Sequence, residues 1–175
     1  MLERLKYPIG KFECPDTISE DHMNNWINDI KKLPKEVIDL VNHFTEEQLE
    51  TPYRNGGWTA RQVIHHLHDS HHHGYIRFKW TLTEESPTIK AYYEDRWAEL
   101  FDSKKAPIQL SLDLLKALHA KWAYFLEGLS FNELQKHFVH PEGNIKISLA
   151  EDIGIYAWHG KHHLAHLQII ADSKG

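Results

Sequence analysis

Histidine is the residue type in this chain with the clearest capacity for chemistry. Fifteen of the 175 residues are histidine, and most of them gather in two short stretches. The first stretch is His65-His66-Leu67-His68 with His71-His72-His73, and the second runs from Trp158 to His166. Imidazole is a common protein ligand for zinc and similar ions, and two histidines four residues apart on a helix present their nitrogens to one point. The two stretches therefore predict a metal site.

Length, charge and cysteine content narrow the class of protein. With 41% apolar residues, the chain is long enough for one buried core, and we expect a single domain over residues 1–175. A net charge of −5, with acids and bases interspersed, gives no basic stripe for nucleic acid or anionic lipid. Cys14 is the only cysteine, which excludes an internal disulfide and fits a reducing compartment. Without a signal peptide or membrane-spanning run, a cytoplasmic location is expected.

Four long segments have the three-and-four apolar spacing of amphipathic helices and predict an all-α fold. Capping boxes begin two of them, one formed by Thr59 and Gln62 and the other by Ser148 and Glu151. Pro34 lies inside the first segment and should kink or break that helix. Four such helices suggest a bundle. The segments are residues 20–44, 59–86, 108–129 and 148–167.

The connections indicate how the four helices are arranged. The link from Pro87 to Pro107 is long enough to be a crossover rather than a tight hairpin. The segment Phe44–Leu49, after the first helix, has an echo in Leu129–Leu134, after the third. This weak internal repeat would make the second and fourth helices equivalent by pseudo-symmetry. It would bring the two histidine stretches to comparable levels of one bundle, as a shared metal requires.

Helical geometry favours one pair of histidines in the fourth helix. At about 100° per residue, His159 and His163 lie on the flank of the apolar stripe, whereas His162 and His166 average roughly 150° away from its centre. His159 and His163 also have the i, i+4 spacing by which H-E-x-x-H helices bind zinc, although the glutamate of that motif is absent. We therefore predict this pair as ligands.

The second helix is less decisive. His71 falls near the middle of the apolar stripe and His66 at its margin, so periodicity alone would favour His71. A ligand at the margin matches the place of His159 on its own helix, as the pseudo-symmetry predicts, so the two histidines stay level. A histidine on a half-buried helix face is more often a hydrogen-bonded packing residue than a ligand. The members of the two stretches that we expect not to bind metal are His65, His68, His72, His73 and His162.

A longer motif resembles a known family. The run from Thr51 to His66 contains Gly56-Gly57-Trp58-Thr59-Ala60-Arg61-Gln62 followed by paired histidines, and it resembles the DinB/YfiT superfamily of metal-dependent hydrolases. The opening Tyr7–Gly10 and the closing Trp158–His166 resemble that family too, so the likeness covers essentially the whole chain.

The resemblance carries specific expectations. It implies a four-helix bundle with up-down-down-up topology, a long crossover between the second and third helices, and a homodimer. It also implies one divalent metal per subunit, held by His66, His159 and His163. This choice favours His66 over His71, which becomes a candidate for lining the pocket or supporting a ligand.

Three histidine ligands are typical of a catalytic zinc site, because structural zinc is normally closed by four protein ligands. The first hypothesis is a hydrolase in which the metal lowers the pKa of a bound water and acts on a small molecule. The second is a thiol S-transferase like related DinB-like proteins, in which the metal binds a low-molecular-weight thiol such as bacillithiol. The third is a metal-binding stress protein without turnover.

Ligand type favours zinc, while nickel, cobalt or copper would also suit three imidazoles. No catalytic base is assigned from the sequence. Asp152 lies on the metal-facing flank of the fourth helix, but an acid in the first turn is equally well explained by the helix dipole.

Overall fold

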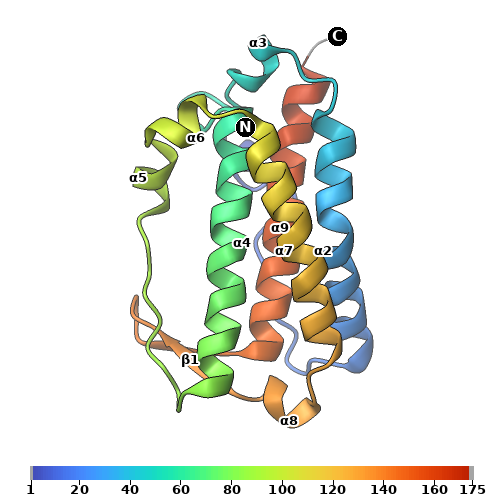
Figure 1. Ribbon diagram of the computed structural model, residues 1–175, viewed down its shortest axis with the longest axis vertical. Coiled ribbons are helices and arrows are strands. Elements are labelled where there is room, and N and C mark those ends of the chain that lie inside the picture. The colour runs from blue at the N-terminus through green and yellow to red at the C-terminus, as the bar shows by residue number, and fades with distance from the viewer. Residues whose placement is uncertain (1, 174–175) are drawn as a thin grey trace.

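Four long helices form the body of the molecule in the computed structural model, which describes residues 2–173. In Figure 1, α2 and α9 run upward from their first residues while α4 and α7 run downward. The predicted four-helix bundle with up-down-down-up topology is therefore confirmed. No helix in residues 2–173 is long and apolar enough to cross a membrane. The four helices are α2 (Glu20–Val41), α4 (Ala60–Thr83), α7 (Ile108–Glu127) and α9 (Leu149–Asp172).

The predicted helix starts agree with the structure. Thr59 Oγ1 accepts from the amide of Gln62, and the Gln62 side chain accepts from the amide of Thr59, which completes the capping box of α4. Ser148 Oγ accepts from the amide of Glu151 at the start of α9. Such contacts satisfy amides that the first turn of a helix leaves without a backbone partner. They fix where the two histidine-bearing helices begin.

Pro34 does not break α2, so that part of the sequence prediction is wrong. The helix continues from Glu20 to Val41 with Pro34 buried inside it. Proline removes one helix hydrogen bond, the one that would end on the carbonyl four residues earlier. That carbonyl belongs to Ile30, and it accepts a hydrogen bond from the side chain of His119 instead. Buried apolar neighbours, Leu33 and Val37 among them, keep the helix packed on either side of the proline.

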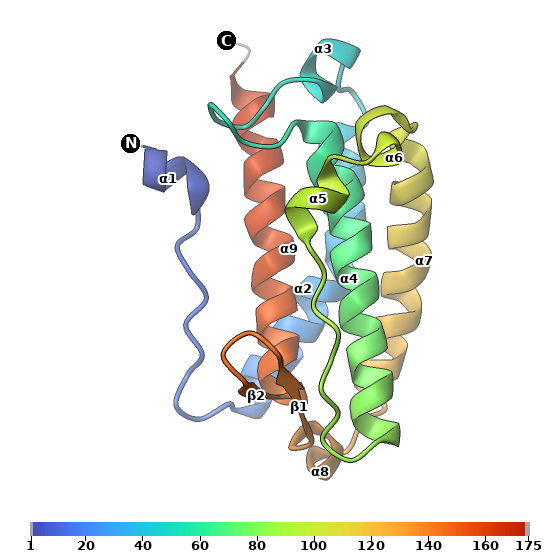
Figure 2. The same ribbon diagram turned by 90° about the vertical axis from the view of Figure 1, so that its left-hand side faces the viewer.

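The crossover between α4 and α7 has the length and course expected. It leaves the lower end of α4 and returns to the upper end of α7, passing in front of α4 in the view of Figure 2. Two short helices lie in it, α5 (Glu94–Ala98) and α6 (Phe101–Lys105). Both contact α4. A further short helix, α1 (Leu2–Lys6), begins the described chain.

The internal repeat is visible in the turns that follow α2 and α7. Each turn holds a four-residue helix, α3 (Glu46–Leu49) in the first half and α8 (Phe131–Leu134) in the second. Each short helix also has a capping box, formed by Thr45 with Gln48 and by Ser130 with Glu133. The resemblance of the two halves supports the equivalence of α4 and α9 that the sequence suggested.

A small hairpin was not foreseen by the all-α prediction. Strands β1 (His137–His140) and β2 (Ile145–Ser148) pair antiparallel, with Phe138 opposite Ile147. The turn between them uses left-handed backbone at Gly143 and Asn144. These two residue types adopt that conformation most readily, so Gly143-Asn144 was the available signal. The hairpin leads directly into α9.

The apolar core is divided into an upper and a lower cluster. The upper cluster includes Leu33, Val37, Ile64, Leu67, Leu115 and Leu167. The lower cluster includes Ile30, Tyr75, Phe78, Trp122, Ile153 and Tyr156. Between these two sets, α4, α7 and α9 carry buried or half-buried histidines: His71, His119, His159 and His163. The bundle therefore holds a layer of imidazole between two apolar layers.

Close helix packing at Gly74 gives a prediction for stability. A Cβ atom on Gly74 would lie 2.5 Å from Tyr156 Cζ and 2.8 Å from Trp122 Cη2, and both rings are buried. Overpacking costs about 1–3 kcal/mol and the better helix propensity of alanine returns up to about 1 kcal/mol. We expect Gly74→Ala to lower the unfolding free energy by roughly 1–2 kcal/mol in urea titrations of metal-free protein.

Gly128→Ala is the control, because a Cβ there meets only ordinary van der Waals contacts. Its unfolding free energy should stay close to that of the parent. Equal losses in the two variants would contradict the packing argument.

Candidate metal centre

His66, His159 and His163 converge at one point between α4 and α9. Each offers a ring nitrogen, and the three nitrogens lie within 4.8 Å of one another. The ring centroids are separated by 5.3 Å for His66 and His159, 4.8 Å for His66 and His163, and 4.5 Å for His159 and His163. The structure thus brings together the three histidines predicted as ligands, and it places His71 behind them.

The donor set fits a divalent metal. The Nε2 atoms of His66 and His159 are 3.2 Å apart. Tetrahedral zinc with bonds of about 2.0–2.1 Å to nitrogen places two ligand nitrogens about 3.3 Å apart. Imidazole nitrogen is also a ligand type that zinc and its neighbours in the transition series prefer. The side chains present could therefore hold such an ion with little movement of the rings.

Burial keeps the three candidate ligands neutral. Burial, opposed by the charge of Asp69 and assisted by the neighbouring His162, lowers the pKa of His66 to about 4. Burial, followed by the nearby imidazoles, lowers the pKa values of His159 and His163 well below the ordinary range. Metal binding requires a nitrogen lone pair that is not occupied by a proton. At neutral pH these rings are in the form that binds metal.

A cavity of about 550 Å³ lies against the three histidines. Trp58 covers one side of them, with its ring 4.6 Å from that of His66 and stacked at 6.2 Å on His163. His159 is only half-buried, so it faces the cavity more openly than the other two. Much of the remaining cavity lining is polar. It includes Ser70, Arg77, Tyr92 and Tyr156, and α5 adds Glu94 and Asp95.

Two groups near the cavity have unusual electrostatics. Arg77 Nε is buried and has no hydrogen-bond partner among the described residues. Asp152 is buried too, and that burial raises the pKa of its carboxyl to about 7, against the opposing effect of Arg77. Neither Asp152 nor any other carboxylate in residues 2–173 joins the three histidines as a possible ligand. The candidate ligand set therefore consists of imidazoles alone.

His162 and His166 are buried, contrary to the rotational argument from the sequence. They lie on the side of α9 away from the apolar stripe, but the N-terminal segment covers that side. The Tyr7 ring lies 5.8 Å from the His162 ring, and the Lys6 carbonyl bonds His166 Nε2. This segment is about 150 residues away in sequence, so helical periodicity could not reveal it. His162, His163 and His166 form a second group that could hold a metal.

The other histidines of the first stretch have ordinary structural contacts. His65 is buried and bonds Ser111 Oγ and the Ala106 carbonyl, so it is a packing residue. His73 stacks on Tyr92 with ring centroids 4.3 Å apart. His72 is exposed. None of these three belongs to either possible metal group in the described chain.

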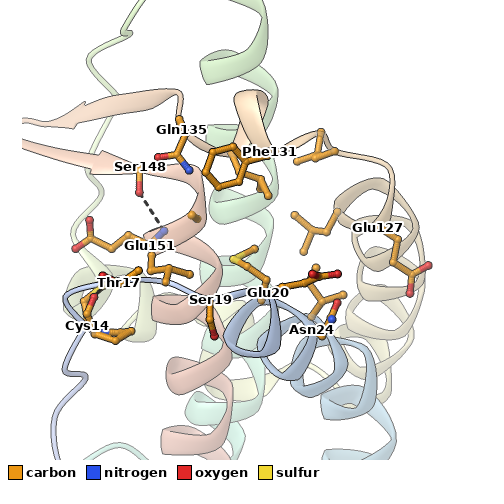
Figure 3. Close-up of a pocket in the computed structure, with 18 of the residues that line it drawn as sticks. Cys14, Thr17, Ser19, Glu20, Asn24, Glu127, Phe131, Gln135, Ser148 and Glu151 are labelled. Carbon is orange, nitrogen blue, oxygen red and sulfur yellow. Dashed lines mark hydrogen bonds between the residues drawn. The ribbon is translucent and has the colours of Figure 1, made fainter.

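A larger cavity lies elsewhere, at the lower end of the bundle. It measures about 980 Å³ and lies where the starts of α2 and α9 meet α8. Figure 3 shows Cys14, Thr17, Ser19 and Glu20 around it, with Ser148 bonded to the amide of Glu151. Cys14 is exposed, and burial raises the pKa of its thiol, which does not favour a thiolate. The histidines that could hold a metal line the smaller cavity instead.

Several known proteins resemble this chain in sequence or in structure. A protein of Oceanobacillus iheyensis named "Putative metal-dependent hydrolase" is 50% identical to this chain, over 97% of both chains. A protein of Bacillus cereus with the same name is 50% identical over 95% of both. The solved structure of YfiT from Bacillus subtilis, described as "a probable metal-dependent hydrolase with an unusual four-helix bundle topology", matches with a TM-score of 0.95. Its sequence identity is 43%, and the match covers 97% of both chains.

The family model of the DinB superfamily matches residues 29–167, a range that contains all three candidate ligands. Together with relatives that are half identical over nearly the whole length, this match shows that the chain belongs to the DinB superfamily.

Proposed function

We propose that this chain is a metal-dependent hydrolase in which His66, His159 and His163 hold one divalent ion. The observation that carries the proposal is the convergence of three neutral imidazoles at the wall of an open cavity, with no fourth protein ligand among residues 2–173. The names of the relatives support the same reaction class. Three protein ligands leave a coordination position for water or substrate.

The cavity residues have separable tasks in this proposal. When bound, the metal supplies a Lewis acid that lowers the pKa of a coordinated water or thiol. Trp58 keeps bulk water from one side of His66 and His163. Arg77, which also lines the cavity, offers a positive charge to a polar or anionic part of the substrate. Zinc is the proposed ion and nickel the alternative, and the homodimer implied by the family stays a prediction.

A thiol S-transferase is the second candidate, and one observation favours it. Hydrolysis through a coordinated water benefits from a nearby proton acceptor. The buried Asp152 does not line the cavity, and Glu94 and Asp95 line it from the exposed helix α5. A coordinated thiol loses its proton without help from a protein base. The same ligand set could therefore serve transfer of a low-molecular-weight thiol to an electrophile.

One experiment separates these functions. Untagged protein is analysed for metal and then incubated with activated esters and amides, and separately with bacillithiol and an electrophile. We expect about one equivalent of divalent metal per chain and metal-dependent cleavage of an ester or amide. A chelator-treated sample and the His66→Ala variant should lose this activity.

Metal-dependent thiol consumption without hydrolysis would make the chain an S-transferase. Bound metal without turnover of either kind would favour the metal-binding stress protein. Protein that takes up no metal would contradict all three.

A further inference from the structure

A chain of buried histidines runs behind the candidate ligand His159 and uses one residue from each long helix. His159 Nδ1 on α9 is 3.1 Å from His71 Nε2 on α4. His71 Nδ1 is 2.9 Å from His119 Nε2 on α7. His119 Nδ1 bonds the carbonyl oxygen of Ile30 on α2. His71 and His119 are almost completely buried, and neither is needed as a ligand.

The Ile30 carbonyl at the far end of this row of histidines determines which nitrogen carries the hydrogen in each ring. A carbonyl oxygen only accepts, so His119 Nδ1 carries the hydrogen, and the Nε2 of the neutral ring is an acceptor. That acceptor requires the hydrogen of His71 on Nδ1, which leaves His71 Nε2 to accept from His159 Nδ1. His159 then has its lone pair on Nε2, the atom that lies 3.2 Å from His66 Nε2 in the candidate site.

Pro34 explains why the Ile30 carbonyl is available. In an uninterrupted helix this oxygen would accept from the amide of residue 34, and proline has no amide hydrogen. The side chain of His119 bonds the oxygen that Pro34 leaves without its helix partner. The proline and the histidine are therefore complementary parts of one arrangement.

His163 has a similar contact on the other side of α9. The Lys6 carbonyl lies 3.3 Å from His166 Nε2, which therefore carries the hydrogen. His166 Nδ1 then accepts from His163 Nδ1, 3.3 Å away. This contact leaves the lone pair of His163 on Nε2. The two carbonyls thus set the same tautomer in both histidines that α9 contributes.

We propose that His119 and His71 on one side, and His166 on the other, are positioning residues that hold His159 and His163 with Nε2 lone pairs directed at one metal. This inference rests on the metal site of the proposed function. Metal-binding histidines usually donate their second nitrogen to a carboxylate, carbonyl or water, which fixes tautomer and ring orientation. Here neutral imidazoles take that place and transmit the effect of a backbone carbonyl.

The contact between His163 and His166 has a competing explanation, because these two rings and His162 could hold a metal themselves. His162 Nδ1 is buried without a hydrogen-bond partner in the described chain. However, the Lys6 carbonyl already occupies one nitrogen of His166, and His163 would have to leave the first site or bridge two ions. We therefore favour the positioning role, and metal stoichiometry distinguishes the two.

The first test reads the tautomers directly in metal-free protein. Long-range ¹H–¹⁵N correlation spectra of ¹⁵N-histidine-labelled protein at pH 7 show which ring nitrogen carries hydrogen. We expect Nδ1–H for His71, His119, His159 and His163 and Nε2–H for His166. Free neutral histidine prefers Nε2–H, so the expected pattern differs from that of unconstrained rings. Nε2–H at His159 or His163 would overturn the proposal.

The second test measures affinity for Zn²⁺ by competition with a chelator. His119→Phe removes the acceptor for His71 and should weaken Zn²⁺ binding about 10–100-fold. His119→Gln keeps an acceptor oxygen and should lose less. The matched control is His65→Phe, which removes a buried histidine whose partners, Ser111 and Ala106, lie outside the site. Equal affinities for His119→Phe and His65→Phe would overturn the proposal.

These tests also separate the inference from the proposed function. If the wild-type protein binds no Zn²⁺, the proposed function fails, while the spectra of metal-free protein still decide the tautomers. Binding of two ions per chain, one of them lost in His162→Ala, would assign His166 to a second site and overturn its positioning role.

Discussion

The metal-free protein is expected to lose most of its stability between pH 6.5 and pH 4. The folded state keeps its buried imidazoles neutral, and burial lowers the pKa values of both His66 and His119 to about 4. The same cause lowers the pKa values of His71, His159 and His163 well below the ordinary range. In the unfolded chain these rings take up protons near pH 6.5.

The direction of the change in unfolding free energy with pH follows from the number of protons that each state binds. Below pH 6.5 the unfolded state binds more protons than the folded state, so the unfolding free energy falls as the pH falls. One ring whose pKa moves from 6.5 to about 4 contributes about 3 kcal/mol to this loss. Asp152 acts in the opposite direction, because burial raises its pKa to about 7 and acid therefore favours its folded form. One carboxyl does not offset five imidazoles.

Urea unfolding of chelator-treated protein at pH 7, 6, 5 and 4 measures this effect. His43→Ala, which removes an exposed histidine, should leave the pH profile unchanged. A midpoint that stays constant from pH 7 to pH 4.5 would show that the imidazole layer is protonated or hydrated in the folded state.

His163→Ala is expected to abolish metal binding while the bundle stays helical. The variant removes one of three candidate ligands, so affinity should fall further than the 10–100-fold typical of supporting residues. The fold does not depend on this ring, because the upper and lower core clusters pack four long helices without it. Metal should therefore stabilise a structure that forms in its absence.

Metal content and far-UV circular dichroism of the variant check both parts. His72→Ala is the matched control, because it also removes a histidine, but His72 is an exposed residue of α4. It should keep its metal. Retention of metal by His163→Ala would exclude His163 as a ligand, and complete unfolding of metal-free wild-type protein would show that the metal is required for folding.

Local signals in the sequence were sufficient for most of the fold. The capping residues Thr59 and Ser148 predicted where α4 and α9 begin, because an N-cap acts over three or four residues. Pro34 did not break α2, and the partner of the carbonyl that it leaves free is His119, which is 85 positions further along the chain. The hairpin at residues 137–148 was missed although Gly143 and Asn144 signalled its turn.

The candidate site was predicted less evenly. Spacing alone selected His159 and His163, and only the family resemblance separated His66 from His71. His119 was missed although periodicity signalled its burial, because it lies four residues after Leu115 and three before Trp122 on the apolar face of α7. The burial of His162 and His166 depends on residues 6–7 at the opposite end of the chain.

The chain of rings that ends on the Ile30 carbonyl has a consequence for proton transport. Hydrogen-bonded imidazoles can pass protons along, but a backbone carbonyl does not take one up, and Ile30 lies in the core with 1% of its surface exposed. A proton that entered this row of imidazoles would therefore find no acceptor at its far end. His66, His159 and His163 would hold a metal whose coordinated water or thiol could lose its proton only by way of the cavity, and the lining of that cavity includes the exposed carboxylates of Glu94 and Asp95.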